Sequence, residues 1–357
     1  MKIYQIFLSK LYLKKFLLLF FAFEFFFTGI DLMQHLKEVP DSANLQILYG
    51  VNKFLEFFSY TLPLSLIFGL ISAMLQIIKS NELVSLYALG VSKAQAAKPF
   101  VLLSFFISLI YILLNTIPGF VQTHLTTHNI KKHGTINNIS SEIFIKSKNT
   151  YAYIGSLNPQ EKKGEDIKIF ITKNGDLKEI IEAKKGYFQK DHWVLQEIIA
   201  CKKPLVDSKN LQETKLNFIH YNHKEVLQGF TPHLIDTLFK TNTRLTIQDS
   251  FFAMKLFQKQ SLKTNKIRAN LYWMTVFPLF APIVIFGLFF LMPIQHRGVN
   301  LTFFTTVSIF ATLVLWGIVF TLSKIANNGS ISPEAGIILP IILLFFVSFY
   351  IYKKYKN

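Results

Sequence analysis

The stretch "KSNELVSLYALGVSK" (Lys79–Lys93) separates two long apolar runs in a sequence that is 51% hydrophobic and only 17% charged. Within it, Leu83, Leu86 and Tyr87 recur at i, i+3 and i+4, the spacing that places side chains on one face of a helix. The pattern predicts a short amphipathic helix held between two membrane-spanning helices.

The ends of this short helix carry their own signals. Ser80 or Asn81 can cap its N-terminus, and Glu82 then lies in the first turn, where a negative charge is favourable. Gly90 can adopt the left-handed conformation that ends a helix, and Ser92 opens an S-x-x-Q capping box for the next one. Two interpretations stay open: a docking helix for a cytosolic protein, or a helix lying flat on the lipid surface.

Six apolar runs are long enough to cross a bilayer as helices, which takes about 20 residues each. The first follows a basic stretch but is too long for a signal-peptide core and has no small-residue cleavage site after it, so we expect it to be retained. The single cysteine, Cys201, excludes an intrachain disulfide. The predicted spans are Phe16–Met33, Phe54–Ile78, Phe100–Val121, Leu271–Met292, Leu301–Ser323 and Gly336–Tyr352.

Basic residues in the short connections gather on one side of these spans. The N-terminal stretch, the 79–93 connection and the C-terminal tail are rich in lysine, whereas the opposite connections dilute their lysines with acids. By the positive-inside rule, both termini and the 79–93 helix are expected in the cytoplasm. The net charge of +17 then reflects membrane anchoring and a basic insert near anionic lipid, and no nucleic acid is expected.

Residues 122–268 form a polar insert between the third and fourth spans. In "DIKIFITKNGDLKEIIEA", isoleucines alternate with polar residues up to Asn174-Gly175, a dipeptide typical of tight hairpins because both positions favour positive φ. The stretches "NTYAYIGSL", "KKGYFQKDHWVLQEIIACKK" and "KLNFIHYN" predict further strands. We expect an antiparallel sandwich or jelly roll, inserted between residues 1–121 and 269–357, which hold three spans each.

Motifs for catalysis are absent from the sequence. It has no G-x-x-x-x-G-K-[ST], no H-E-x-x-H and no G-x-S-x-G, so the chain is not expected to bind ATP through a P-loop. His124, His128 and His133 lack an acid or cysteine to complete a metal site, and fit a polar linker helix. No catalytic residue, metal or cofactor is expected, which disfavours a membrane enzyme that acts on lipids.

Two carboxylates, Glu24 and Asp31, lie seven residues apart in the first predicted span and therefore share a helical face. Ionisable residues inside a membrane are functional candidates because burying a charge there is costly. Glu24 either faces a cavity or partner helix, or is hydrogen-bonded by a neighbouring span. Asp31 lies near the outer boundary, where solvation is the alternative to a functional role.

Basic residues also occur at the outer ends of two predicted spans. His35 and Lys37 follow the first span, and Lys263, Lys266 and Arg268 precede the fourth. Together they would form a basic rim suited to a phosphorylated lipid headgroup, since lysine and arginine pair well with phosphate. The alternative is that they simply extend to the membrane interface.

The order of three spans, a long β insert and three more spans resembles the lipopolysaccharide export permeases LptF and LptG. "LPLSLIFGLI" (Leu62–Ile71), followed by "NELVSLYALGVSK", is similar to the family's signature after its second span, with Glu82 and Gly90 the firmest matches. "NKIRANLYWMTVFPLFAPIVIFGLFF" resembles the family's entry to the fourth span, and the region around Trp193 resembles its jelly-roll strands. The resemblance covers nearly the whole chain.

The resemblance implies a polytopic α-helical protein of the bacterial inner membrane, with six transmembrane helices and an inserted periplasmic antiparallel β jelly-roll domain. It implies a permease subunit of an ABC-type exporter that extracts lipopolysaccharide and passes it to a periplasmic bridge of jelly-roll proteins. A separate cytosolic ABC ATPase dimer would hydrolyse ATP, and a paralogous permease would complete a heterodimer. The implied coupling helix, at about residues 80–90, would use Glu82, Leu83, Leu86, Tyr87 and Gly90.

The outer end of the first span departs from the family. The G-type permease has several basic residues there, whereas "IDLMQHLKEVP" contains one lysine and one histidine, although the surrounding stretch looks slightly more G-type than F-type. An alternative function also stays open: a membrane-anchored envelope scaffold or binding protein with no transport role, which would need no cytosolic partner.

Overall fold

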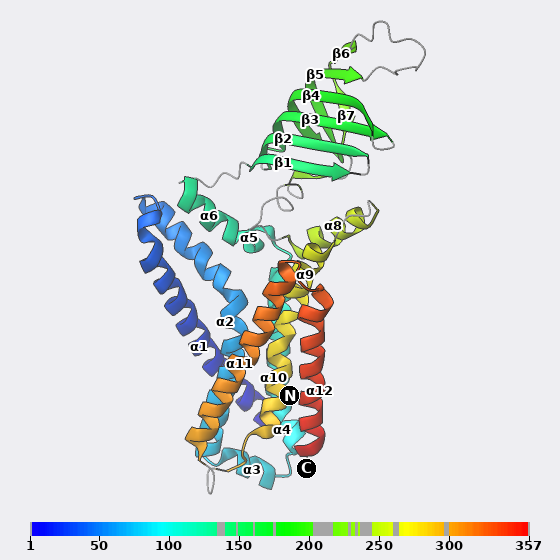
Figure 1. The fold of residues 1–357 in the computed structure, drawn as a ribbon. Helices are drawn as coiled ribbons and strands as arrows, with labels where there is room; N and C mark the ends of the chain where they lie inside the picture. Colours follow the sequence, from blue (N-terminus) through cyan, green and yellow to red (C-terminus); the bar gives the residue numbers. More distant parts are fainter. Residues whose placement is uncertain are drawn as a thin grey trace. The chain divides into compact units, whose positions relative to one another are not determined.

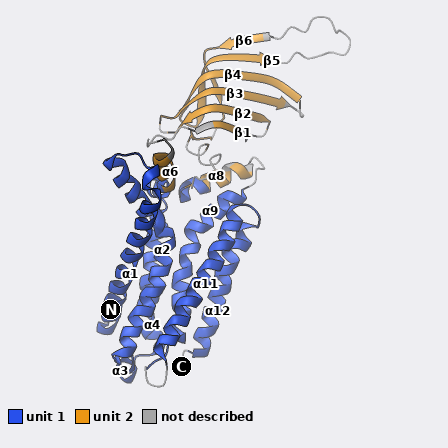
Figure 2. Ribbon diagram, turned by 60° about the vertical axis from the view of Figure 1, so that its left-hand side comes forward, with its two compact units in different colours: residues 1–123, 246–250, 264–357 blue, residues 124–245, 251–263 orange. Residues whose placement is uncertain are grey.

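The chain folds into two compact units in a computed structural model (Figure 2). Unit 1 comprises residues 1–123, 246–250 and 264–357, and unit 2 comprises residues 124–245 and 251–263. The structure describes residues 2–133, 140–147, 149–159, 161–173, 176–202, 217–227, 230–232, 235, 245–259, 264–295 and 300–355.

Unit 1 is a helical bundle, and among the described residues six of its helical segments are long and apolar enough to cross a membrane (Figure 1). This confirms the predicted fold class of six spans with an inserted antiparallel β region. The first two spans are longer than their apolar runs, because polar residues extend each helix beyond its apolar part. The spans are α1 (Ile3–His35) with a 3-10 turn (Leu36–Glu38), α2 (Ala43–Lys79), α4 (Lys93–Leu114), α9 (Asn265–Thr275) continuing through a 3-10 turn (Phe277–Leu279) into α10 (Phe280–Leu291), α11 (Leu301–Asn327), and a π-helical turn (Glu334–Ile338) continuing into α12 (Leu339–Tyr355).

Shorter helices connect these spans to one another and to the β strands. They are α3 (Glu82–Ala88), α5 (Pro118–Val121), α6 (Thr123–His133) and α8 (Ile247–Lys259). Of these, α6 contains the three histidines that were predicted to lie on a linker helix.

Helix α2 is the centre of the bundle, packing against α1, α10 and α11. Its residues Leu66, Ile67 and Leu70 are fully buried. Aromatic pairs fill the α1–α2 interface, such as Phe20 with Phe58, whose ring centroids are 5.0 Å apart. By contrast, α1 and α11 present long apolar faces outward, rich in phenylalanine on α1 and mostly aliphatic on α11, as expected for helices in contact with lipid or another apolar chain.

Helix α1 approaches α2 closely at Gly69. A Cβ built on Gly69 would lie 3.0 Å from the Cα of Phe16, a backbone atom that cannot move aside. We expect Gly69→Ala to destabilise unit 1 by about 1–3 kcal/mol through overpacking. Thermal unfolding of the purified chain in detergent measures this loss.

Gly29 provides the matched control on the facing helix. A Cβ at Gly29 would meet no atom within 4 Å, so Gly29→Ala should leave the melting temperature unchanged or raise it slightly. Equal melting temperatures for the two variants would mean that the helices separate at no cost at this point.

Unit 2 contains one antiparallel sheet in which strands β1 to β6 follow each other in chain order and β7 pairs with β5. The predicted hairpin is confirmed in its strands, because β3 and β4 pair as far as Lys173 and Asp176; its turn, Asn174-Gly175, lies outside the described residues. The strands are β1 (Ser140–Ser147), β2 (Thr150–Asn158), β3 (Lys163–Lys173), β4 (Asp176–Gln189), β5 (His192–Lys202), β6 (Asn217–Tyr221) and β7 (Lys224–Val226).

A row of irregular residues crosses this sheet at one level. Glu142, Asp166 and Glu197 have positive φ angles of 57°, 51° and 53°, and the strand registers place Gly155 and Lys184 between them on β2 and β4. On β2 to β5, the alternation of buried and exposed positions therefore shifts by one residue at this row, as bulges and bends permit. The clearest examples follow a spacing of three in place of two: Ile154 to Leu157, Gly164 to Ile167, Ala183 to Gly186 and Leu195 to Ile198.

Candidate functional site

Helix α3 joins α2 to α4 through two tight turns, and its C-terminal turn matches the sequence-based prediction. Gly90 has φ +82°, its N–H donates to the carbonyl of Tyr87 at 2.9 Å, and the next N–H donates to Leu86 at 3.1 Å. This is the hydrogen-bond pattern of a left-handed helix end. Ser92 and Gln95 then form the predicted capping box, with contacts of 3.3 and 3.2 Å.

The predicted N-terminal cap of α3 is wrong. Asn81 adopts a left-handed conformation with φ 59°, and its side chain caps nothing. The Ser80 hydroxyl donates to the Gln76 carbonyl at 3.0 Å, so it completes the end of α2. The chain reverses so sharply between α2 and α3 that neither side chain reaches the first amides of α3.

The apolar face predicted for docking is turned into the protein. Leu83 is 2% exposed within the core of unit 1, and Leu86 and Tyr87 pack against the same core. The outward face of α3 includes Val84 and, at its C-terminal cap, Leu89, which is 81% exposed. Sequence periodicity finds the apolar face of a helix but cannot say whether that face meets the chain itself or a partner.

Two polar atoms on α3 lie inside without partners among the described residues. Glu82 Oε2 and Tyr87 Oη have no exposed area and no hydrogen bond. Burial raises the pKa of the Tyr87 hydroxyl to about 12, so that hydroxyl stays neutral at physiological pH. A buried acceptor without a donor costs about 1–3 kcal/mol, so this position of Glu82 Oε2 lowers the stability of unit 1.

Glu24 is fully buried between α1 and α2, where the Thr61 hydroxyl donates to its Oε1. One of its oxygens is therefore engaged by a neighbouring span, whereas Oε2 is buried and accepts no hydrogen bond from the described residues, so a functional role for Glu24 stays a prediction. Asp31 accepts a hydrogen bond from the Tyr49 hydroxyl at 2.6 Å and lies 3.6 Å from the Lys53 ammonium. The two carboxylates thus bind α1 to α2.

The predicted basic rim is partly engaged within the chain. His35 Nδ1 lies 3.5 Å from Asp31 Oδ1, and Arg268 Nη1 donates to Glu334 Oε1 at 2.6 Å. Lys37 and Lys266 are exposed, and Lys263 lies outside the described residues. Arg268 thus connects α9 to the turn before α12, while Lys37 and Lys266 have exposed side chains that a phosphate can reach.

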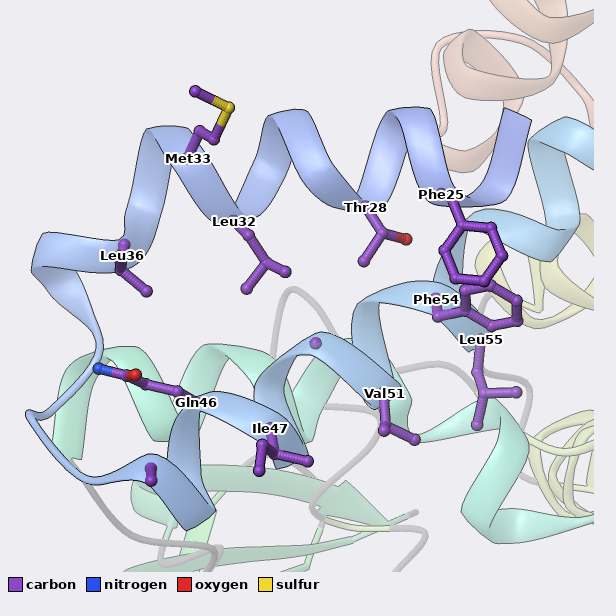
Figure 3. A pocket seen from close by; sticks show the side chains of 12 residues that line it. Phe25, Thr28, Leu32, Met33, Leu36, Gln46, Ile47, Val51, Phe54 and Leu55 are labelled. Carbon is purple, nitrogen blue, oxygen red and sulfur yellow. The ribbon is translucent and has the colours of Figure 1, made fainter. Parts of the chain in front are cut away.

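An apolar groove of about 660 Å³ lies between the C-terminal part of α1 and the N-terminal part of α2 (Figure 3). Figure 3 shows Phe25 and Phe54 together at one end, and Met33 and Leu36 toward the other. No charged residue lines it, and a volume of this size fits a small-molecule ligand or acyl chains. No sequence motif predicted this groove, because it depends on the divergence of two helices.

These features define a polytopic membrane protein with an inserted antiparallel β unit, a short helix between its second and third spans, and an apolar groove on its first two spans. A sequence profile of the family described as lipopolysaccharide export system permease LptF/LptG matches residues 7–354. The chain belongs to this family. Together with the six apolar helices, this membership indicates an inner-membrane transport protein. A search of curated proteins found no match to the sequence.

Proposed function

We propose that this chain is a permease subunit of a lipopolysaccharide exporter, with α3 as the coupling helix for a separate cytosolic ATPase dimer. The observation that carries the proposal is α3 itself, fixed between two tight turns and presenting Val84 and Leu89 outward, with the half-buried Glu82 in its first turn. The coupling helix and both termini are then cytoplasmic, and unit 2 is periplasmic.

The chain itself contributes binding and movement. The apolar groove on α1 and α2 accepts acyl chains, and exposed Lys37 and Lys266 are the candidates for headgroup phosphates. A paralogous permease completes the lipid cavity against the outward apolar faces of α1 and α11. Unit 2 relays the lipid to periplasmic bridge proteins of the jelly-roll type.

ATP can drive such a cycle only if the two ATPase states bind α3 differently, since a ligand shifts a conformational equilibrium only by its differential affinity. Rigid attachment of α3 to α2 and α4 is therefore as important as its contact surface. Leu83, Leu86 and Tyr87 provide that attachment by packing into the core.

The test is to replace residues 80–90 by a Gly/Ser linker and to purify the chain from native membranes in mild detergent. Wild-type chain should bring down an ATPase and a second permease, and the linker variant should retain the permease but lose the ATPase. ATP-driven release of lipopolysaccharide from proteoliposomes should be lost with it. If the linker is harmless to both, the chain is an envelope scaffold or binding protein and α3 couples nothing.

A further inference from the structure

Lys93, the first residue of α4, reaches across to the C-terminal end of α10. Its Nζ donates a hydrogen bond to the carbonyl oxygen of Phe290 at 2.9 Å and lies 5.8 Å from the centre of the Phe290 ring. The two residues are 197 positions apart in the chain. This is a specific contact between the entry of one span and the exit of another.

The chemistry of the α10 terminus explains why a cation binds there. The helix ends at Leu291, and Met292 is already extended, with ψ 139°. The last carbonyls of a helix have no partners within it and carry its partial negative charge. Pro293, which has no N–H, cannot supply one. The Lys93 ammonium therefore satisfies both the hydrogen bond and the charge at Phe290.

The same contact continues into neighbouring spans. Phe290 is 1% exposed, and its ring lies 5.0 Å from that of Tyr352 on α12. The adjacent Phe289 lies 5.6 Å from Phe100 on α4. On the other side, Lys93 directly follows the Ser92 cap that receives the chain from α3. One side chain thus connects the exit of α3 to α10 and, through Phe290, to α12.

We propose that Lys93 is a positioning residue that makes α3, α4 and α10 move as one body, so that displacement of α3 by the ATPase reaches α10 and, through its packing on α2, the helices that line the apolar groove. The inference rests on the proposed function, because it assigns Lys93 a role in transmitting that movement. It predicts that breaking the contact separates ATP hydrolysis from lipid transport and leaves ATPase docking intact, since the docking face of α3 is unchanged.

The experiment compares Lys93→Met, Lys93→Arg and Lys98→Met in the purified complex with its ATPase, reconstituted in proteoliposomes. Lys98 is an exposed lysine one and a half turns further along α4 and serves as the control. The complex with Lys93→Met should retain the ATPase and its rate of ATP turnover. The amount of lipopolysaccharide released per ATP should fall at least about fivefold, which is the lower end of typical coupling between two sites. Lys93→Arg should restore most of that ratio, and Lys98→Met should behave as wild type.

A normal ratio of lipid to ATP in Lys93→Met would overturn the proposal, whereas a wild-type complex that captures no ATPase would overturn the proposed function instead. A second measurement does not depend on the variant's folding. Cys201 is replaced by serine so that it takes no label, and cysteines introduced by Ala88→Cys and Ile294→Cys carry spin labels. The labels report the distance between α3 and the end of α10 in the complex. That distance should be the same with and without a trapped ATP analogue; a change would show that the two helices move separately and would overturn the role of Lys93.

Discussion

Glu82→Arg is expected to abolish ATP-driven lipopolysaccharide release and to weaken capture of the ATPase by more than about tenfold. Glu82 lies half-buried in the first turn of α3, two residues before the outward Val84, so the proposed interface would cover its carboxylate. Breaking a charge pair that an interface buries costs about 2–5 kcal/mol, and arginine would in addition reverse the charge at this position. The measurements are the ATPase recovered with the chain and the lipid released from proteoliposomes.

Two controls separate the contact from general damage. Glu82→Gln keeps the shape and one acceptor, so it should retain part of the binding. Asp41→Arg makes the same charge reversal at an exposed carboxylate in the connection between α1 and α2, and should have no effect. If Glu82→Arg binds the ATPase and exports lipid as well as Asp41→Arg does, Glu82 is outside the interface.

The spans, the C-terminal turn of α3 and the cap of α4 were predictable because their signals are local. Apolar runs give the six spans, Gly90 gives the left-handed turn, and the Ser92 capping box needs only residues three apart. The N-terminal cap of α3 failed because Asn81 entered the left-handed region, which removed its side chain from the first amides. A capping rule based on sequence applies only where the residue before the helix adopts the usual extended backbone conformation.

The contacts that give charged residues their roles were not predictable, because they join distant segments. Arg268 is a headgroup candidate by its position, but nothing near it in the sequence indicates its partner Glu334, 66 residues away. Glu24 could have faced a cavity, and only the packing of α2 showed Thr61 as its donor. Lys93 was counted as one more basic residue flanking a span, since nothing nearby in the sequence indicates Phe290.

In unit 2, alternation identified β2 to β6 but not how the sheet bends. At the row of positive-φ residues through Asp166 and Glu197, the alternation of buried and exposed positions shifts by one residue. On β5, for example, the next buried residue after Leu195 is Ile198. A strict period of two predicts the opposite face beyond that point. Charged residues at positive φ give no sequence signal comparable to glycine, so the bend was not visible in the composition of the strands.

Trp193→Ala is expected to destabilise unit 2 by about 3–5 kcal/mol, a large part of the stability of an ordinary domain. Trp193 is fully buried, packs edge-on against Phe188 with centroids 5.8 Å apart, and donates its indole N–H to the Phe230 carbonyl at 2.8 Å. The substitution removes this packing and that hydrogen bond together. Hydrogen exchange of the strand amides in the full-length chain measures the loss without separating the units.

Trp193→Phe separates the contribution of the hydrogen bond from that of the ring packing. It keeps most of the ring packing but leaves the buried Phe230 carbonyl without its donor, which costs about 1–3 kcal/mol. Phe218→Ala, at an aromatic residue of the same sheet that is 60% exposed, should change exchange little. If Trp193→Ala exchanged no faster than Phe218→Ala, the packing around Trp193 would not hold the sheet together. Unit 2 would then be stabilised mainly by its strand hydrogen bonds, and a lipid chain could displace the indole at little cost.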